Sequence, residues 1–400
     1  MVFYIFFIMK EPELTSTKLN IFKSDDTDED KEVLNNNNKI SYKKRIPYID
    51  CVRIVGMYAI IINNILIYGG VIKKYKKYNQ LGLMNTFSFW HVNSFALISG
   101  IVGFKTSKYS NLLFLWLCAL FYSIYFHLIF KIFKPITVKD KKIFYNFFPA
   151  VFIKYWYFTE YFGMYLFLPL INNGITNINK GDLKLFILSL IGIFIFWKDF
   201  MNNGDPFKMA NGYSVLWLLI FYITGTYFGK FKINVNGNKL FFCLICIIVF
   251  SGSTLLCFFL PFYKGKYNTL TIIIKIRQIF SLRINSFPMI LQSISLTLFF
   301  SQIKFNKYIG KIITFLGPLT FGVYLIHENE YVRKNIIGNL FSNDSVNLPL
   351  KAVIFLLIYR SFLVFLICSI MDFFRHIIFM LFKIKKICIY LEKKLKKLFN

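Results

Sequence analysis

The chain has 400 residues, of which 56% are hydrophobic and 20% aromatic, and its mean hydropathy is +0.54. A soluble globular protein is closer to half apolar and has fewer aromatic residues, so this composition excludes an ordinary soluble enzyme. The formal net charge of +29 does not indicate a nucleic-acid partner, because the lysines lie in short loops and tails between apolar segments, as in membrane proteins.

Residues 1–46 precede the first long apolar segment. Residues 1–9 are apolar but too short to cross a bilayer, and no small-residue cleavage site follows them. The remainder is polar, with an acidic run at residues 25–30 and four asparagines at residues 35–38. This composition cannot bury a core, so we expect residues 1–46 to be a disordered polar segment.

Ten apolar segments follow, each close to the length that a helix needs to cross a bilayer. They lie near residues 50–70, 85–104, 110–132, 150–171, 184–201, 213–230, 239–261, 286–302, 312–328 and 352–373. The sequence therefore predicts an all-α, multi-span helical membrane protein with about ten transmembrane helices, whose membrane domain covers residues 47–374.

Basic residues flank this domain at both ends. With an even number of spans, the positive-inside rule places both termini on the cytoplasmic side of the membrane. The sequon Asn343-Asp344-Ser345 then lies on the opposite side. In residues 375–400 lysine alternates with isoleucine, leucine and phenylalanine, which predicts a basic amphipathic helix on the membrane surface.

The sequence contains no P-loop, dinucleotide-binding glycine pattern, metal-ligand cluster or nucleophile elbow. We therefore expect no permanently bound cofactor and no metal. The seven cysteines lie within or beside apolar segments, where a thiol behaves as a small apolar group. They are Cys51, Cys118, Cys243, Cys246, Cys257, Cys368 and Cys388.

The first predicted span carries polar residues at two depths. Asp50 and Arg53 lie at its start, and Asn63 and Asn64 lie inside its apolar run. Asn64 follows Arg53 by eleven residues, which is about 16 Å along a helix axis. A polar side chain at that depth is costly in lipid, so we expect Asn64 to face a bundle interior or a wet cavity.

A series of motifs runs through the chain from about residue 46 to residue 373. In order they are Arg53-x10-Asn64 followed by Gly69-Gly70, residues 91–100 ending in Ser99-Gly100, Lys105-x-x-Lys108, residues 155–161 with Pro169 and Asn172, residues 211–213 with Trp217, Tyr222 and Gly225, Phe287-Pro288 with Gln292, and residues 322–329. In this set and order the chain resembles acyltransferase family 3, and within it the enzymes that O-acetylate capsular polysaccharides. The family pattern has histidine where this chain has Asn64.

The resemblance implies transfer of an acetyl group from acetyl-CoA to a carbohydrate hydroxyl by a protein in the lipid bilayer. Such a reaction needs cations for the phosphates of the donor, and arginine and lysine both bind phosphate. Arg53, Lys105 and Lys108 lie near the same ends of spans one and two, so they are predicted to form a phosphate clamp. The alternatives are positive-inside anchoring for the two lysines and an ion pair with Asp50 for Arg53.

The reaction also needs a general base and donors to the oxyanion. An asparagine has no useful basicity, although Asn64 can orient a hydroxyl or donate to an oxyanion. His91 is predicted to lie at a depth similar to that of Asn64, so it can supply an imidazole; an interfacial histidine is the alternative. His327, with Glu328 beside it, is a second candidate for the base, and a structural hydrogen bond is its alternative.

Glu160 lies inside the fourth predicted span. A carboxyl group within an apolar span marks a functional site or a buried ion pair. Glu160 can orient a histidine, bind the acceptor sugar or pair with Lys154, and the sequence does not choose among these roles.

Two other functions stay open. One is an inactive relative that retains the fold and binds acyl-CoA or glycan, which the replacement of the histidine by Asn64 would explain. The other is a secondary transporter, for which two halves with matching broken spans are expected. We find no such internal repeat in the sequence.

Overall fold

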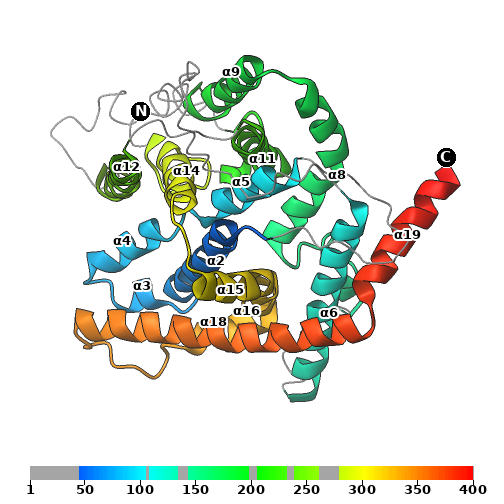
Figure 1. Ribbon diagram of the computed structural model, residues 1–400. Coiled ribbons are helices and arrows are strands. Elements are labelled where there is room, and N and C mark those ends of the chain that lie inside the picture. The colour runs from blue at the N-terminus through cyan, green and yellow to red at the C-terminus, as the bar shows by residue number, and fades with distance from the viewer. Residues whose placement is uncertain are drawn as a thin grey trace.

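The computed structural model describes residues 45–104, 108–133, 143–197, 205–231, 238–260 and 279–399. The segment predicted to be disordered, residues 1–46, lies outside these ranges except for its last two residues. Across the described ranges the secondary structure is helical and no strand occurs, which confirms the predicted all-α fold (Figure 1).

The helices follow one another with short connections. In chain order they are α2 (Pro47–Ile67), α3 (Val71–Lys74), α4 (Asn79–Phe87), α5 (His91–Gly103), α6 (Tyr109–Phe133), α7 (Ile143–Phe147), α8 (Trp156–Asn177), α9 (Lys180–Ile191), α11 (Val215–Lys230), α12 (Lys239–Phe259), α14 (Phe287–Ser301), α15 (Lys307–Leu316), α16 (Thr320–His327), α17 (Glu330–Asn335), α18 (Leu350–Leu381) and α19 (Ile384–Phe399). Short 3₁₀ or π segments lie at Gly192–Trp197, Ala210–Gly212, Gly317–Leu319 and Ile337–Asn339.

Within the described residues, each of the ten predicted spans overlaps one of these helices or two consecutive helical segments. Five helical segments of the described chain are long and apolar enough to cross a membrane: Pro47–Ile67, Tyr109–Phe133, Lys239–Phe259, Lys307–His327 and Leu350–Leu381. Val215–Lys230 and Phe287–Ser301 are apolar but shorter. A multi-span membrane protein is therefore confirmed, while the count of ten and the side on which each terminus lies stay predictions.

The second predicted span, residues 85–104, is not one helix. It comprises the end of α4 and all of α5, and the chain turns between them at residues 88–90. The side chains of Thr86 and Ser88 bond back to the carbonyls of Gly82 and Met84, at 3.1 and 2.8 Å, which competes with the helical backbone pattern. As a result His91 is the first residue of a new helix.

The ninth predicted span is also interrupted. α15 ends at Leu316, the segment Gly317–Leu319 makes a 3₁₀ turn, and α16 continues to His327. Pro318 has no backbone N–H and cannot continue an α-helical pattern here. This turn lies against the first turn of α2, next to Asp50.

α2 lies in the middle of the bundle (Figure 1). It packs against α5, α14, α15, α16 and α18, and 67% of its most apolar stretch is buried inside the protein. Asp50, Asn63 and Asn64 are all buried, so the polar side chains of the first span face protein and not lipid, as the sequence predicted.

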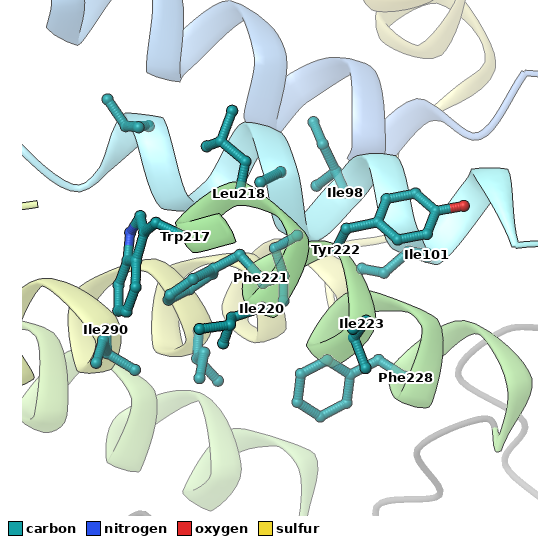
Figure 2. Packing of buried hydrophobic residues seen from close by; sticks show 14 of the residues in the cluster. Ile98, Ile101, Trp217, Leu218, Ile220, Phe221, Tyr222, Ile223, Phe228 and Ile290 are labelled. Atoms are coloured by element: carbon teal, nitrogen blue, oxygen red, sulfur yellow. The ribbon is translucent and has the colours of Figure 1, made fainter. Parts of the chain in front are cut away.

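α5 and α11 pack closely along much of their length. Figure 2 shows Ile98 and Ile101 of α5 near Leu218 and Tyr222 of α11, and all four belong to one buried apolar cluster. A methyl group on Gly225 would run into the backbone of α5 at Leu97, so only glycine permits this approach. Small residues at the crossing therefore set how closely the two helices pack.

Four residues of the predicted motifs hold this region together by hydrogen bonds. The Trp217 indole donates to the Oδ1 of Asn93 at 2.9 Å, and the Tyr222 hydroxyl bonds to the Oδ1 of Asn172 at 2.8 Å. The amide of Asn172 in turn donates to the carbonyl of Gly103 at 3.2 Å. These residues therefore position α5, α8 and α11.

α19 returns along α6 (Figure 1). The segment that the sequence assigns to a basic tail thus contains the end of α18 and a separate helix. Its position on a membrane surface stays a prediction.

The glycine contact between α5 and α11 predicts a stability effect. Gly225→Ala should lower the unfolding temperature in detergent, because overpacking a tight contact typically costs about 1–3 kcal/mol. Gly252→Ala is the matched control, since a methyl group there meets nothing within 4 Å and alanine favours the helix by roughly 1 kcal/mol. Equal unfolding temperatures for the two variants would contradict this account of the packing.

Candidate active site

A cavity of about 640 Å³ runs beside α2. Its volume lies within the range of about 300–1,000 Å³ that is usual for small-molecule sites. Four of the predicted site residues line it: Arg53 and Asn64 of α2, His91 of α5 and Glu328 at the end of α16. The fold therefore brings together residues from three distant parts of the chain around one space.

One end of the cavity holds an ion-pair network. The buried carboxylate of Asp50 accepts two hydrogen bonds from Arg45, at 2.7 and 2.8 Å, and one from Arg53 at 2.6 Å. Gly317 lies directly against this carboxylate, and a methyl group there would be only 2.5 Å from the Cγ of Asp50. Two guanidinium groups on one carboxylate leave this end positively charged.

The other end is organised around Glu328. Its Oε1 accepts from the Nδ2 of Asn64 at 2.6 Å, and its Oε2 accepts from Arg333 at 3.1 Å. The guanidinium of Arg333 also lies 4.6 Å from the centre of the Tyr68 ring. Both carboxylate oxygens are thus engaged, which suits Glu328 to holding its neighbours more than to taking a proton from a substrate.

His91 lies between the two ends. Its Cβ is near Gly56, one turn beyond Arg53, and its Nδ1 is 2.7 Å from the carbonyl of Ser88, to which Asn63 also donates at 3.3 Å. A carbonyl only accepts, so Nδ1 carries the proton. The Nε2 of the neutral ring is then the unprotonated nitrogen, and His91 can accept a proton there.

His327 is held in the same way but lies outside the cavity lining. It is completely buried, with its Nδ1 2.6 Å from the carbonyl of Val323. Its Nε2 has no hydrogen-bond partner within the described part of the chain. The two imidazoles are close enough to interact electrostatically, and His91 is the one that reaches the cavity.

Glu160 is half-buried on α8 and does not line the cavity. It interacts with the backbone of Val215, the first residue of α11, where a carboxylate stabilises the free N–H groups of the helix. This helix-end contact is not one of the three roles predicted from the sequence, which stay predictions.

Two of the three residues of the predicted phosphate clamp, Arg53 and Lys108, lie in the described part of the chain. Arg53 lines the cavity, whereas Lys108 is exposed at the start of α6 and is not among the lining residues. Lys105 lies outside the described residues. The three-residue clamp therefore stays a prediction.

Several cavity residues were not foreseen from the sequence. Arg45 and Lys385 line the cavity and belong to segments interpreted as tails, and Arg333 contacts two lining residues, Glu328 and Tyr68. The position of Arg45 could have indicated its role, because it lies five residues before Asp50 at the edge of the first span. No comparable signal connects Lys385 with a site more than 300 residues earlier in the chain.

The contact between Asn64 and Glu328 predicts a difference between two substitutions. Asn64→Leu removes the donor and leaves a buried carboxylate oxygen unsatisfied, which costs about 1–3 kcal/mol. Asn64→His retains an N–H at the same position. Thermal unfolding should therefore show a clear loss of stability for leucine and a smaller one for histidine, and the reverse order would show that this hydrogen bond contributes nothing.

Comparison with known proteins agrees with the geometry. Residues 46–375 match the model of acyltransferase family 3, described as an acyltransferase domain. Neither the curated proteins nor the solved structures searched gave a match. The matched region contains Arg53, Asn64, His91 and Glu328 and ends before α19.

Proposed function

The chain belongs to acyltransferase family 3, and from this premise we propose that it moves an acetyl group from acetyl-CoA to a hydroxyl of a carbohydrate. Family membership and the apolar helices make it a membrane acyltransferase. The observation that supports the finer proposal is the single cavity, which connects a cationic end at Arg53 with a histidine and a carboxylate farther along α2.

The cationic end suits the donor. Coenzyme A carries several phosphates, and Asp50 engages Arg53 through only one of its amino groups. A guanidinium has five N–H donors, so Arg53 retains donors for a phosphate. The extended pantetheine arm of the donor would then follow the cavity and bring the thioester toward His91.

His91 suits the role of general base. Its Nε2 would accept the proton of the acceptor hydroxyl while that oxygen attacks the thioester carbonyl carbon. The tetrahedral oxyanion collapses with loss of the CoA thiolate, which receives the proton from the imidazolium, so the base is regenerated. Asn64 uses one N–H for Glu328, and its second N–H is a donor available to the oxyanion or the hydroxyl.

The opposite end suits a polyhydroxylated acceptor. Glu328 lines the cavity there together with the aromatic rings of Tyr68 and Tyr213, and Arg333 contacts both Glu328 and Tyr68. Sugars bind through such combinations of polar groups and flat apolar faces. Donor and acceptor would thus approach His91 from different ends of the same cavity.

Asn64 favours a second function. If the reaction depends on the histidine of the family pattern, this chain is an inactive relative that binds acyl-CoA or glycan. His91 is the feature that favours the active enzyme, because its Nε2 is fixed as the unprotonated nitrogen and its side chain lines the cavity.

Transfer of labelled acetyl groups separates these possibilities. The protein in lipid should acetylate one or more carbohydrates when supplied with labelled acetyl-CoA. His91→Ala should lower kcat about 10²–10⁴-fold, the usual contribution of a general base, with little change in donor affinity. His376→Ala, an exposed histidine outside the cavity lining, is the control and should leave kcat unchanged.

Other results would exclude parts of the proposal. A wild-type protein without transfer that gains it in Asn64→His is the inactive relative. Wild-type activity that survives His91→Ala would remove His91 as the base and direct attention to His327.

A further inference from the structure

We propose that the carbohydrate acceptor of this enzyme carries two hydroxyl groups on neighbouring carbons, one that receives the acetyl group and one that Asn64 binds through its Oδ1. The acceptor is thus a vicinal diol, and Asn64 recognises the substrate from the position where the family pattern has a histidine. This inference rests on the proposed function, because it names the class of acceptor for the same cavity.

The amide of Asn64 has a fixed orientation. Its Nδ2 lies 2.6 Å from the Oε1 of Glu328, and the ion pair of Glu328 with Arg333 keeps that carboxylate an acceptor. A carboxylate cannot donate, so the amide nitrogen must face Glu328 and Oδ1 must point elsewhere. Asn64 lines the cavity, and its Oδ1 accepts no hydrogen bond from the described part of the chain. This oxygen is therefore available to a donor on a ligand.

His91 offers a second acceptor in the same cavity. The carbonyl of Ser88, 2.7 Å from Nδ1, holds the proton on that nitrogen, so Nε2 carries no hydrogen. Among the described residues Nε2 has no hydrogen-bond partner either. The protein thus presents two acceptors to the ligand here, and the ligand must supply both hydrogens. A ligand with a single hydroxyl satisfies only one of them.

Two connections place Asn64 beside His91. Asn63, the preceding residue, donates to the carbonyl of Ser88 at 3.3 Å, and His91 bonds to the same oxygen. On the other side, Glu328, the partner of Asn64, directly follows the other buried imidazole, which interacts electrostatically with His91. The two acceptors therefore belong to adjoining parts of the cavity wall, as hydroxyl groups on neighbouring carbons require.

An acceptor left without a donor penalises the wrong substrate. A site built to bond a substrate hydroxyl rejects the analogue that lacks it, because a desolvated polar atom then loses its partner. Asn64 is only 7% exposed, so a ligand that fills the cavity leaves little water to replace the missing hydroxyl. A diol satisfies Asn64 and His91 together, whereas its monodeoxy analogue leaves the Oδ1 of Asn64 unsatisfied.

Kinetics with the full-length protein in lipid and labelled acetyl-CoA test the proposal. The acceptors are methyl glycosides of common hexoses and, for each glycoside that is acetylated, its monodeoxy derivatives. Loss of one hydroxyl beside the acetylated position should lower kcat/KM about 10–100-fold, the effect of one unsatisfied buried acceptor. Loss of a hydroxyl farther around the ring should change kcat/KM much less.

Asn64→Leu assigns this preference to its residue. The variant removes the Oδ1 acceptor, so it should acetylate the diol and the monodeoxy acceptor with similar kcat/KM. A merely structural role of Asn64 would lower both values and retain their ratio, which is how the paired comparison separates the two roles. Asn64→Ala also removes the acceptor and avoids overpacking, and it replaces the leucine variant if that protein does not fold.

Asn63→Leu is the matched control. It removes the neighbouring amide, whose Nδ2 bonds to the Ser88 carbonyl and whose Oδ1 is buried within the protein, so the wild-type ratio of the two acceptors should persist even if kcat falls.

Three results would overturn the inference while leaving the enzyme proposal intact. They are equal kcat/KM for the diol and all its monodeoxy derivatives, a wild-type ratio in the Asn64 variants, and acetylation of the primary hydroxyl alone, which has no hydroxyl on the neighbouring carbon of a pyranoside. A wild-type protein that transfers no acetyl group to any glycoside would overturn both.

Discussion

The structure depends on the cost of carrying polar side chains through lipid on α2. An ionised or amide side chain in the hydrocarbon layer needs partners within the protein. Asp50 is satisfied by two arginines, and Asn64 by Glu328. These requirements keep α2 in the interior with other helices around it, and the cavity that follows α2 is lined by the same polar groups.

Asn64 separates two tasks that one histidine can combine. An imidazole at that position can donate one N–H to Glu328 and use its other nitrogen as a base. Asn64 donates its Nδ2–H to Glu328 at 2.6 Å, but an amide cannot accept a proton as a base. His91 offers the missing lone pair from the neighbouring helix, because the Ser88 carbonyl fixes its tautomer. The break between α4 and α5 makes this possible, since it frees that carbonyl at the start of the helix.

Much of the fold was predictable because lipid imposes long apolar segments, and each of the ten predicted segments overlaps a helix in the described part of the chain. The pairing of Asp50 with Arg53 was also accessible, since residues three apart on a helix are neighbours. The break before His91 was not, because residues 85–104 have the length of one span and the sequence does not show that the side chains of Thr86 and Ser88 bond back to the helix carbonyls. Asn64 and Glu328 are 264 residues apart, and Lys385, which lines the same cavity, belongs to α19 near the end of the sequence. Such contacts depend on tertiary packing and leave no local pattern.

The central claim is that one cavity holds the donor phosphates near Arg53 and the reacting acyl group near His91. An experimental map of the protein bound to a non-transferable thioether analogue of acetyl-CoA tests it directly. The account predicts phosphate density against Arg53, with the carbon that stands for the acyl carbonyl close enough to His91 Nε2 for a hydroxyl to lie between them. Phosphates at the Glu328 end, or an acyl group outside the cavity, would contradict it.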